Sequence, residues 1–112
     1  MKHLKLFEEY DKGVIELGEI KYRGHDLMFY YYQDPSDESK KIIWADDIND
    51  GEPYIDVTTI LPKAAKVDNS VWVKLGGQEE ELADKLVEMG KLQRRDVHSS
   101  SGYNKYAAYT IL

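Results

Sequence analysis

Alternating apolar and polar positions run through most of this chain, as in strands that bury one face of a sheet. Aromatic and β-branched residues are concentrated in these segments, which favours pleated structure. The pattern predicts six strands: Val14–Tyr22, Leu27–Gln33, Lys41–Ala45, Tyr54–Leu61, Val71–Leu75 and Tyr103–Leu112. The short links Arg23-Gly24-His25-Asp26 and Asn49-Asp50-Gly51 predict two hairpins, because their glycines tolerate a left-handed backbone.

One segment has helical rather than strand periodicity. Over residues 78–91, Leu82, Leu86 and Met89 stand at i, i+4 and i+7. Glu79–Glu81 occupy the first turn, where the helix dipole favours negative charge. Gly90 is a suitable C-terminal cap, so the pattern predicts a helix over residues 78–91.

The remaining segments complete the expected architecture. Residues 94–102 are predicted to be a flexible basic loop. Residues 2–11 fit a short helix or a strand, and the helix is preferred. The sum is an α+β fold in which an antiparallel sheet of about five to six strands packs against one main helix. The length of 112 residues predicts a single domain, residues 1–112.

Charge is distributed unevenly along the chain. The formal net charge is −6, from 15 basic and 21 acidic residues. Residues 34–56 hold two basic and eight acidic groups, a net charge of −6, whereas residues 91–112 hold four and one, a net charge of +3. An acidic segment of this kind is most often a solvated loop, and it can also attract a basic partner.

Composition and spacing exclude most catalytic and metal chemistry. The chain has no cysteine, which removes disulfides, thiol nucleophiles and cysteine-based metal sites. His3, His25 and His98 share no metal-ligand spacing. The loop Asp46–Gly51 lacks the ligand pattern of a calcium loop, and Gly76-Gly77 is not followed by a phosphate-binding lysine. We therefore expect no enzyme, no catalytic residues, no metal and no cofactor. The absence of a long apolar run predicts no membrane association.

A basic and aromatic cluster near the C-terminus is the strongest candidate for binding. Aromatic rings can stack on bases while basic groups pair with phosphates, and the same set can bind an acidic protein surface. The candidate binding residues are Arg94, Arg95, His98, Tyr103, Lys105 and Tyr106.

Several short motifs resemble a known family. Asp50-Gly51-Glu52-Pro53-Tyr54, then Thr58-Thr59-Ile60-Leu61-Pro62, and finally Gly102-Tyr103 before a closing strand resemble a family of small phage and mobile-element proteins known only as a domain of unknown function. The likeness covers about residues 42–112, and the opening Met1–Tyr10 is similar to openings common in small proteins of tailed phages. The resemblance implies a mobile-element origin, and therefore the cytoplasm of a bacterial host.

Three functions remain open. The first is a non-enzymatic protein-interaction module that binds or inhibits a host protein, including a defence component. The second is a nucleic-acid-associated accessory protein that uses the basic C-terminal segment, and the third is a small-molecule or nucleotide binder. A host protein is the expected partner, and a homo-oligomer is also compatible with the opposed charges.

Overall fold

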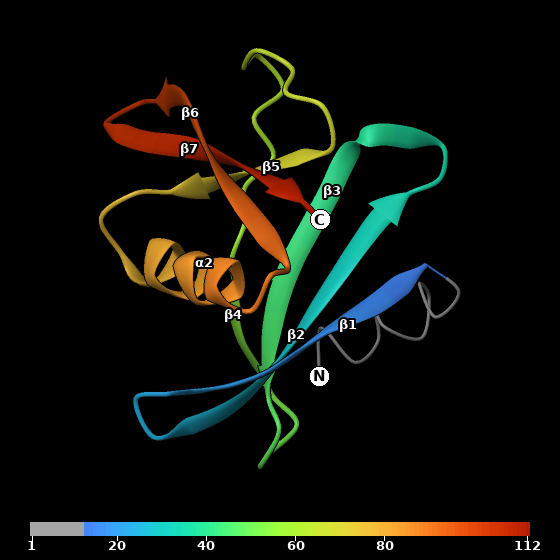
Figure 1. Ribbon diagram of the computed structural model, residues 1–112, viewed down its shortest axis with the longest axis vertical. Coiled ribbons are helices and arrows are strands. Elements are labelled where there is room, and N and C mark those ends of the chain that lie inside the picture. Colours follow the sequence, from blue (N-terminus) through green and yellow to red (C-terminus); the bar gives the residue numbers. More distant parts are fainter. Residues whose placement is uncertain (1–12) are drawn as a thin grey trace. The chain divides into compact units, whose positions relative to one another are not determined.

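The computed structural model describes residues 13–112, so the short helix expected over residues 2–11 lies outside the described residues. Contacts divide the chain into two compact units; the first ends at Asp56 and the second is Val57–Leu112. Each unit holds one antiparallel sheet (Figure 1). The α+β class is confirmed, but the described residues form seven strands in two sheets rather than five to six strands in one.

The first unit is a four-stranded meander in which sequence neighbours pair. Its strands, in the order β1-β2-β3-β4, are β1 (Val14–Tyr22), β2 (His25–Asp34), β3 (Asp37–Asp47) and β4 (Pro53–Asp56). Leu27, Phe29 and Tyr31 alternate along β2 and are buried. Their partners across the ladder, Asp47, Ala45 and Ile43, are also buried, so these rows form the buried face of this sheet.

Turn chemistry explains the hairpins of this unit. Arg23 and Gly24 have φ angles of 49° and 82°, the two positive values that a type I′ turn requires. A further hairpin, absent from the predicted pattern, joins β2 to β3. There Ser36 donates hydrogen bonds from its backbone N–H (2.9 Å) and its hydroxyl (2.7 Å) to Asp34 Oδ1. Because the turn and the first residues of β3 are polar, the apolar pattern predicted only residues 41–45 of this strand.

The predicted strand Tyr54–Leu61 is divided between the two units. β4 ends at Asp56, and Thr59 forms an isolated antiparallel bridge with Trp72 in the second unit. The Thr59 N–H donates to the Trp72 carbonyl at 2.9 Å.

The second unit packs one helix on a three-stranded sheet. The sheet has the order β5-β7-β6 and consists of β5 (Ser70–Lys74), β6 (Leu92–Ser101) and β7 (Asn104–Ile111). The helix α2 (Gln78–Glu88) contacts β5 and β6 and buries Leu82, Ala83 and Leu86. Val71 and Val73 pair with Tyr109 and Ala107, and all four are buried.

The end of α2 is a Schellman motif. Gly90 has φ 76°, its N–H donates to the Val87 carbonyl at 3.0 Å, and the Lys91 N–H donates to the Leu86 carbonyl at 2.9 Å. The predicted capping role of Gly90 is thus confirmed. The helix ends at Glu88 rather than at residue 91, and Met89 is exposed instead of joining the core.

The basic segment is a strand, and the predicted flexible loop over residues 94–102 is wrong. β6 lies at the edge of its sheet, and from Gln93 to Ser101 its side chains are exposed or half-buried. An edge strand with this exposure needs no apolar alternation, so its sequence carries no strand signal.

Candidate interaction surface

The β6–β7 hairpin presents most of the predicted binding residues. Its strands are joined by a two-residue turn, Gly102-Tyr103, between the paired Ser101 and Asn104. Gly102 has φ 61°, and the first central position of a type II′ turn is where glycine is favoured. The turn holds Tyr103 at the tip, where its side chain is fully exposed.

Arg94 is held within the second unit. Its guanidinium lies 2.7 Å from Glu80 Oε2 and 3.1 Å from Asp84 Oδ2, both on α2. The guanidinium carbon lies 5.5 Å from the centre of the Tyr109 ring, and the Tyr109 hydroxyl donates to Asp84 Oδ1 at 2.6 Å. Arg94 therefore joins β6 to the helix, and its charge is neutralised within the unit.

This polar cluster shifts the pKa of Glu80 and the pKa of Tyr109. The Gly76 N–H donates to Glu80 Oε1 at 2.9 Å, and this bond, with Arg94, lowers the pKa of Glu80. Burial raises the pKa of Tyr109, and the hydrogen bond to Asp84 raises it further. Both shifts favour the protonation states that make the contacts observed.

Tyr106 is also unavailable for binding, because it is buried in β7. The candidate residues left on the surface are Arg95, His98, Tyr103 and Lys105. His98 pairs in register with Ala107, two residues from Lys105, so His98 and Lys105 lie on the same face of the hairpin.

An irregularity in β6 surrounds Arg95. Three residues separate Arg94 from His98, whereas one residue separates their partners Tyr109 and Ala107. The register shift therefore lies among Arg95, Asp96 and Val97, and the carboxylate of Asp96 lies 3.8 Å from His98 Nδ1. Bulges and charges on an edge strand oppose pairing with a further strand, so this edge of the sheet is protected against extension.

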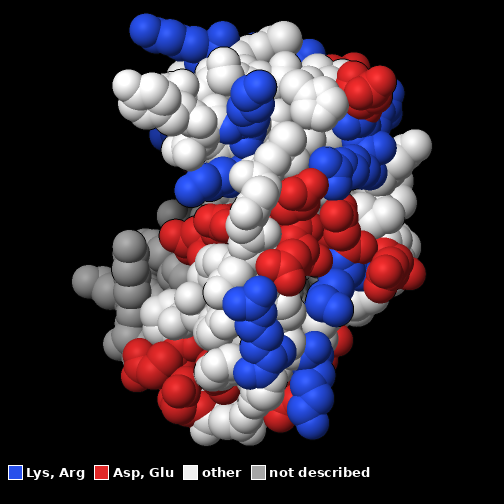
Figure 2. Space-filling model, turned by 90° about the vertical axis from the view of Figure 1, so that its left-hand side faces the viewer, with Lys and Arg blue, Asp and Glu red and all other residues white. Residues whose placement is uncertain are grey.

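Figure 2 views the side on which α2 lies. Acidic side chains gather in the middle of this view, at the height of α2, and basic side chains stand above them, at the height of the β6–β7 hairpin. The second unit therefore presents both signs of charge side by side.

The first unit contains a histidine–carboxylate pair that the sequence did not indicate. His25 Nδ1 lies 2.7 Å from Asp47 Oδ2, and the His25 ring packs 4.8 Å from the ring of Tyr54. The hydrogen bond with His25, together with the Asn49 N–H at 2.9 Å, lowers the pKa of Asp47. The two residues are 22 positions apart in sequence, and they meet because the hairpin register places the start of β2 beside the end of β3.

The described part of the chain contains neither a metal-binding cluster nor a helix suited to span a membrane. Residues 13–112 contain no group of three histidine, aspartate or glutamate side chains arranged to hold a metal ion. No helix within these residues has the length and apolar character to cross a bilayer.

Comparison of the chain with protein-family models, curated proteins and solved structures found no match.

Proposed function

We propose that this chain is a non-enzymatic protein-interaction module of a phage or mobile element, and that its β6–β7 hairpin binds an acidic surface of a bacterial host protein, such as a defence component. One observation carries the proposal. Tyr103 is fully exposed on a two-residue turn and is accompanied on the same hairpin by the exposed cations Arg95 and Lys105.

Binding through Tyr103 costs little conformational entropy. Tyrosine is enriched among residues that dominate interface energies, because it buries a large ring with few rotatable bonds. A tight turn between paired strands fixes the backbone at Tyr103 before binding, so less conformational entropy is lost in the complex. Arg95 and Lys105 then select partners with acidic surfaces.

The reduced set of free cations favours a protein partner over nucleic acid. Arg94 is engaged by Glu80 and Asp84, and α2 adds further carboxylates to the same unit. A strand of phosphates would meet this negative field close to the hairpin, whereas a compact acidic patch on a protein needs only the hairpin tip.

The test is a quantitative capture experiment from lysate of a bacterial host. Tyr103→Ala and the double variant Arg95→Glu/Lys105→Glu are compared with the wild type. The matched control is Lys63→Glu/Lys66→Glu, which makes the same change of charge at exposed lysines outside the hairpin. Captured protein is identified by mass spectrometry, and its affinity is then measured by calorimetry with purified components.

We expect the wild type and the lysine control to bind the same partner. Tyr103→Ala should weaken binding by about 30-fold, the equivalent of roughly 2 kcal/mol for a central tyrosine. Equal affinity of the hairpin variants and the wild type would contradict the proposal. Capture that disappears after nuclease treatment would instead support the nucleic-acid function.

A further inference from the structure

The histidine–carboxylate pair of the first unit has the geometry of a positioned nucleophile. His25 Nδ1 lies 2.7 Å from Asp47 Oδ2. Only 11% of the Asp47 side chain is exposed, whereas 45% of the His25 side chain is exposed. Enzymes use a buried carboxylate in this way to orient an imidazole that reacts or transfers a proton. The pair therefore combines a fixed hydrogen-bond acceptor with an accessible ring.

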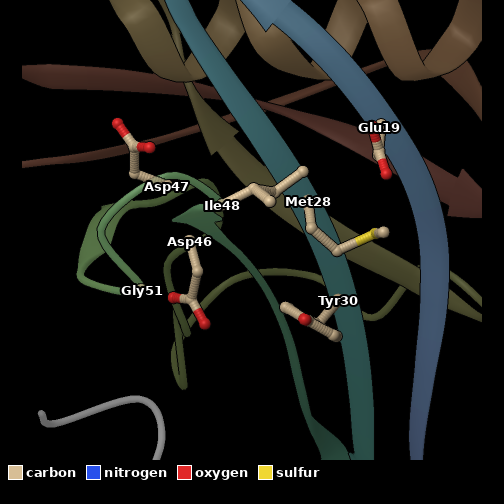
Figure 3. Close-up of a pocket in the computed structure, with 7 residues that line it drawn as sticks. All are labelled: Glu19, Met28, Tyr30, Asp46, Asp47, Ile48 and Gly51. Carbon is tan, nitrogen blue, oxygen red and sulfur yellow. The ribbon is translucent and has the colours of Figure 1, made fainter.

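The sheet and the turn that follows it fix the position of the carboxylate. Asp47 pairs with Leu27 in the ladder between β2 and β3, and His25, two residues before Leu27, lies on the same face. Figure 3 shows the carboxylates of Asp46 and Asp47 pointing in opposite directions at the end of β3. The Asp47 N–H donates to the Glu52 carbonyl at 2.8 Å, which holds the backbone of Asp47 in the turn.

The hydrogen bonds determine which nitrogen of His25 can react. The bond with His25 and a second bond, from the Asn49 N–H at 2.9 Å, lower the pKa of Asp47. The carboxylate is therefore ionised and can only accept hydrogen bonds, so Nδ1 is the nitrogen that carries the proton. In the neutral ring the lone pair is then on Nε2. Nε2 is thus the nucleophilic atom of this pair.

The Tyr54 ring borders the imidazole. Its centre lies 4.8 Å from the centre of the His25 ring, with an interplanar angle of 48°. Tyr54 also meets the buried Tyr22 edge to face, with ring centres 6.4 Å apart and an interplanar angle of 80°. These contacts restrict rotation of the imidazole and place an apolar surface beside it.

Negative charge predominates in the turns next to the pair. Asp26 Oδ2 accepts a hydrogen bond from the Asn49 side chain at 3.4 Å, and Asp50 Oδ1 accepts a backbone N–H of the same turn at 2.8 Å. The hairpin turn contributes one cation, Arg23, which lies 5.1 Å from the centre of the Tyr22 ring. An anionic donor, such as a phosphate compound, would approach the ring against this charge, whereas an uncharged donor would not.

We propose that His25 is a modification site whose Nε2 accepts an acyl group from an uncharged acyl thioester. The Nε2 lone pair attacks the carbonyl carbon, an N–C bond forms, and the C–S bond breaks with its electron pair leaving on sulfur. The Nδ1 proton passes through Asp47 to water, and the thiolate takes a proton from water, so the products are a neutral acyl-imidazole and a thiol. Asp47 is a positioning residue that holds the tautomer and stabilises the positive charge developing on the ring.

This modification is stoichiometric, so it is compatible with a non-enzymatic module. His25 belongs to the first unit and the β6–β7 hairpin to the second. Failure of either proposal therefore leaves the other unaffected.

His98 provides an internal control for the test. Its side chain is 52% exposed, more than that of His25, but its Nδ1 lies 3.8 Å from Asp96, beyond hydrogen-bond distance. The protein is treated with diethyl pyrocarbonate at about pH 8.5, where free histidine is neutral. Peptide mass spectrometry then measures the rate of modification at each histidine. His25 should react about tenfold faster than His98, the rate equivalent of one strengthened hydrogen bond.

Asp47→Asn tests the carboxylate, and Asp50→Asn is the matched control, because asparagine keeps the oxygen that accepts the backbone N–H of the turn. Asp47→Asn should reduce the rate at His25 to that at His98, and Asp50→Asn should change it little. Nitrogen chemical shifts of the imidazole should place the proton on Nδ1 in the wild type, and amide spectra show whether each variant keeps the fold. If Asp47→Asn does not fold, the wild-type rates and the nitrogen shifts decide.

The donor class is tested with phenyl thioacetate, an uncharged thioester, and acetyl phosphate, an anionic acyl donor. Each rate is divided by the rate of the same donor with free imidazole. The wild type should release thiophenol faster than His25→Gln, and His98→Gln should match the wild type. Acetyl phosphate should acylate His25 at least about tenfold more slowly than the thioester on this scale.

Four results would overturn the proposal. These are a rate at His25 no greater than the rate at His98; a proton on Nε2 in the nitrogen spectra; a folded Asp47→Asn protein that reacts as fast as the wild type; and equal corrected rates for the two acyl donors.

Discussion

Replacing Arg94 by alanine should destabilise the second unit rather than remove a binding contact. The side chain makes ion pairs with Glu80 and Asp84 and lies over the Tyr109 ring. Because 37% of the Arg94 side chain is exposed, solvent screens these contacts. Each exposed ion pair contributes about 0.2–1 kcal/mol, and a cation over an exposed ring contributes about 0.5–1 kcal/mol.

Together these contacts predict that Arg94→Ala lowers the free energy of unfolding by about 1–2 kcal/mol, allowing for their overlap. The matched variant is Arg95→Ala, next in sequence and exposed in the bulge, which should change the free energy by less than about 0.5 kcal/mol. Urea unfolding followed by circular dichroism measures both values, and hydrogen exchange of α2 and β7 amides shows whether the loss lies in the second unit.

Salt and a double-mutant cycle separate the charge contribution from packing. In about 1 M salt the Debye length falls to roughly 3 Å, so the difference between Arg94→Ala and the wild type should shrink. Combining Arg94→Ala with Glu80→Gln should give less than the sum of the single effects. Equal stabilities of the Arg94 and Arg95 variants, with partner binding lost only in the Arg94 variant, would refute the reasoning.

Three further predictions concern buried or paired groups. Tyr109→Phe removes the hydrogen bond to Asp84 and should lower the free energy of unfolding by about 1–2 kcal/mol. Because the pKa of Tyr109 is raised in the folded state, the unfolded chain ionises first above about pH 10. Urea unfolding at pH 9 and 11 should therefore show a steeper alkaline loss of stability for the wild type than for the variant. The pKa of Asp47 is lowered by His25, so its contribution is present above about pH 4 and is lost as the pH falls through the folded-state pKa; Asp47→Asn should flatten the acid limb of stability measured between pH 5 and 2. Leu86→Ala, at a fully buried position of α2, should cost about 2–5 kcal/mol in the same urea assay, and a loss below 1 kcal/mol would contradict its place in the core.

Local signals allowed part of the fold to be predicted. β1 has the predicted bounds because Gly13 precedes it and the turn Arg23-Gly24 follows it. The helix was predictable from its apolar spacing, and Gly90 marks its end through a positive φ. In each case the information lies within a few residues of the feature.

The missed features depend on residues distant in sequence. β6 carries no apolar alternation because it lies at a sheet edge, and only pairing with β7 makes it a strand. The division of the predicted strand at Asp56 follows from the pairing of Thr59 with Trp72. Neither local propensity nor periodicity contains that pairing information.

The candidate site shows the same limit in its chemistry. The sequence identified six residues by type, but it could not show that Arg94 faces two acids on α2 or that Tyr106 is buried. The sequence predicted Gly102 in a loop and Tyr103 in a strand, whereas the two residues form the turn at the exposed tip of the hairpin.

The structure also changes the meaning of the charge distribution. The net charge of +3 over residues 91–112 suggests a broad basic surface, yet Arg94 is neutralised by carboxylates of the preceding helix. The remaining exposed cations are few, and at physiological salt their attraction for a partner is largely screened beyond about 8 Å. Under the proposed function, recognition would therefore depend on close contact by the exposed Tyr103, with charge selecting among the surfaces that the ring can reach.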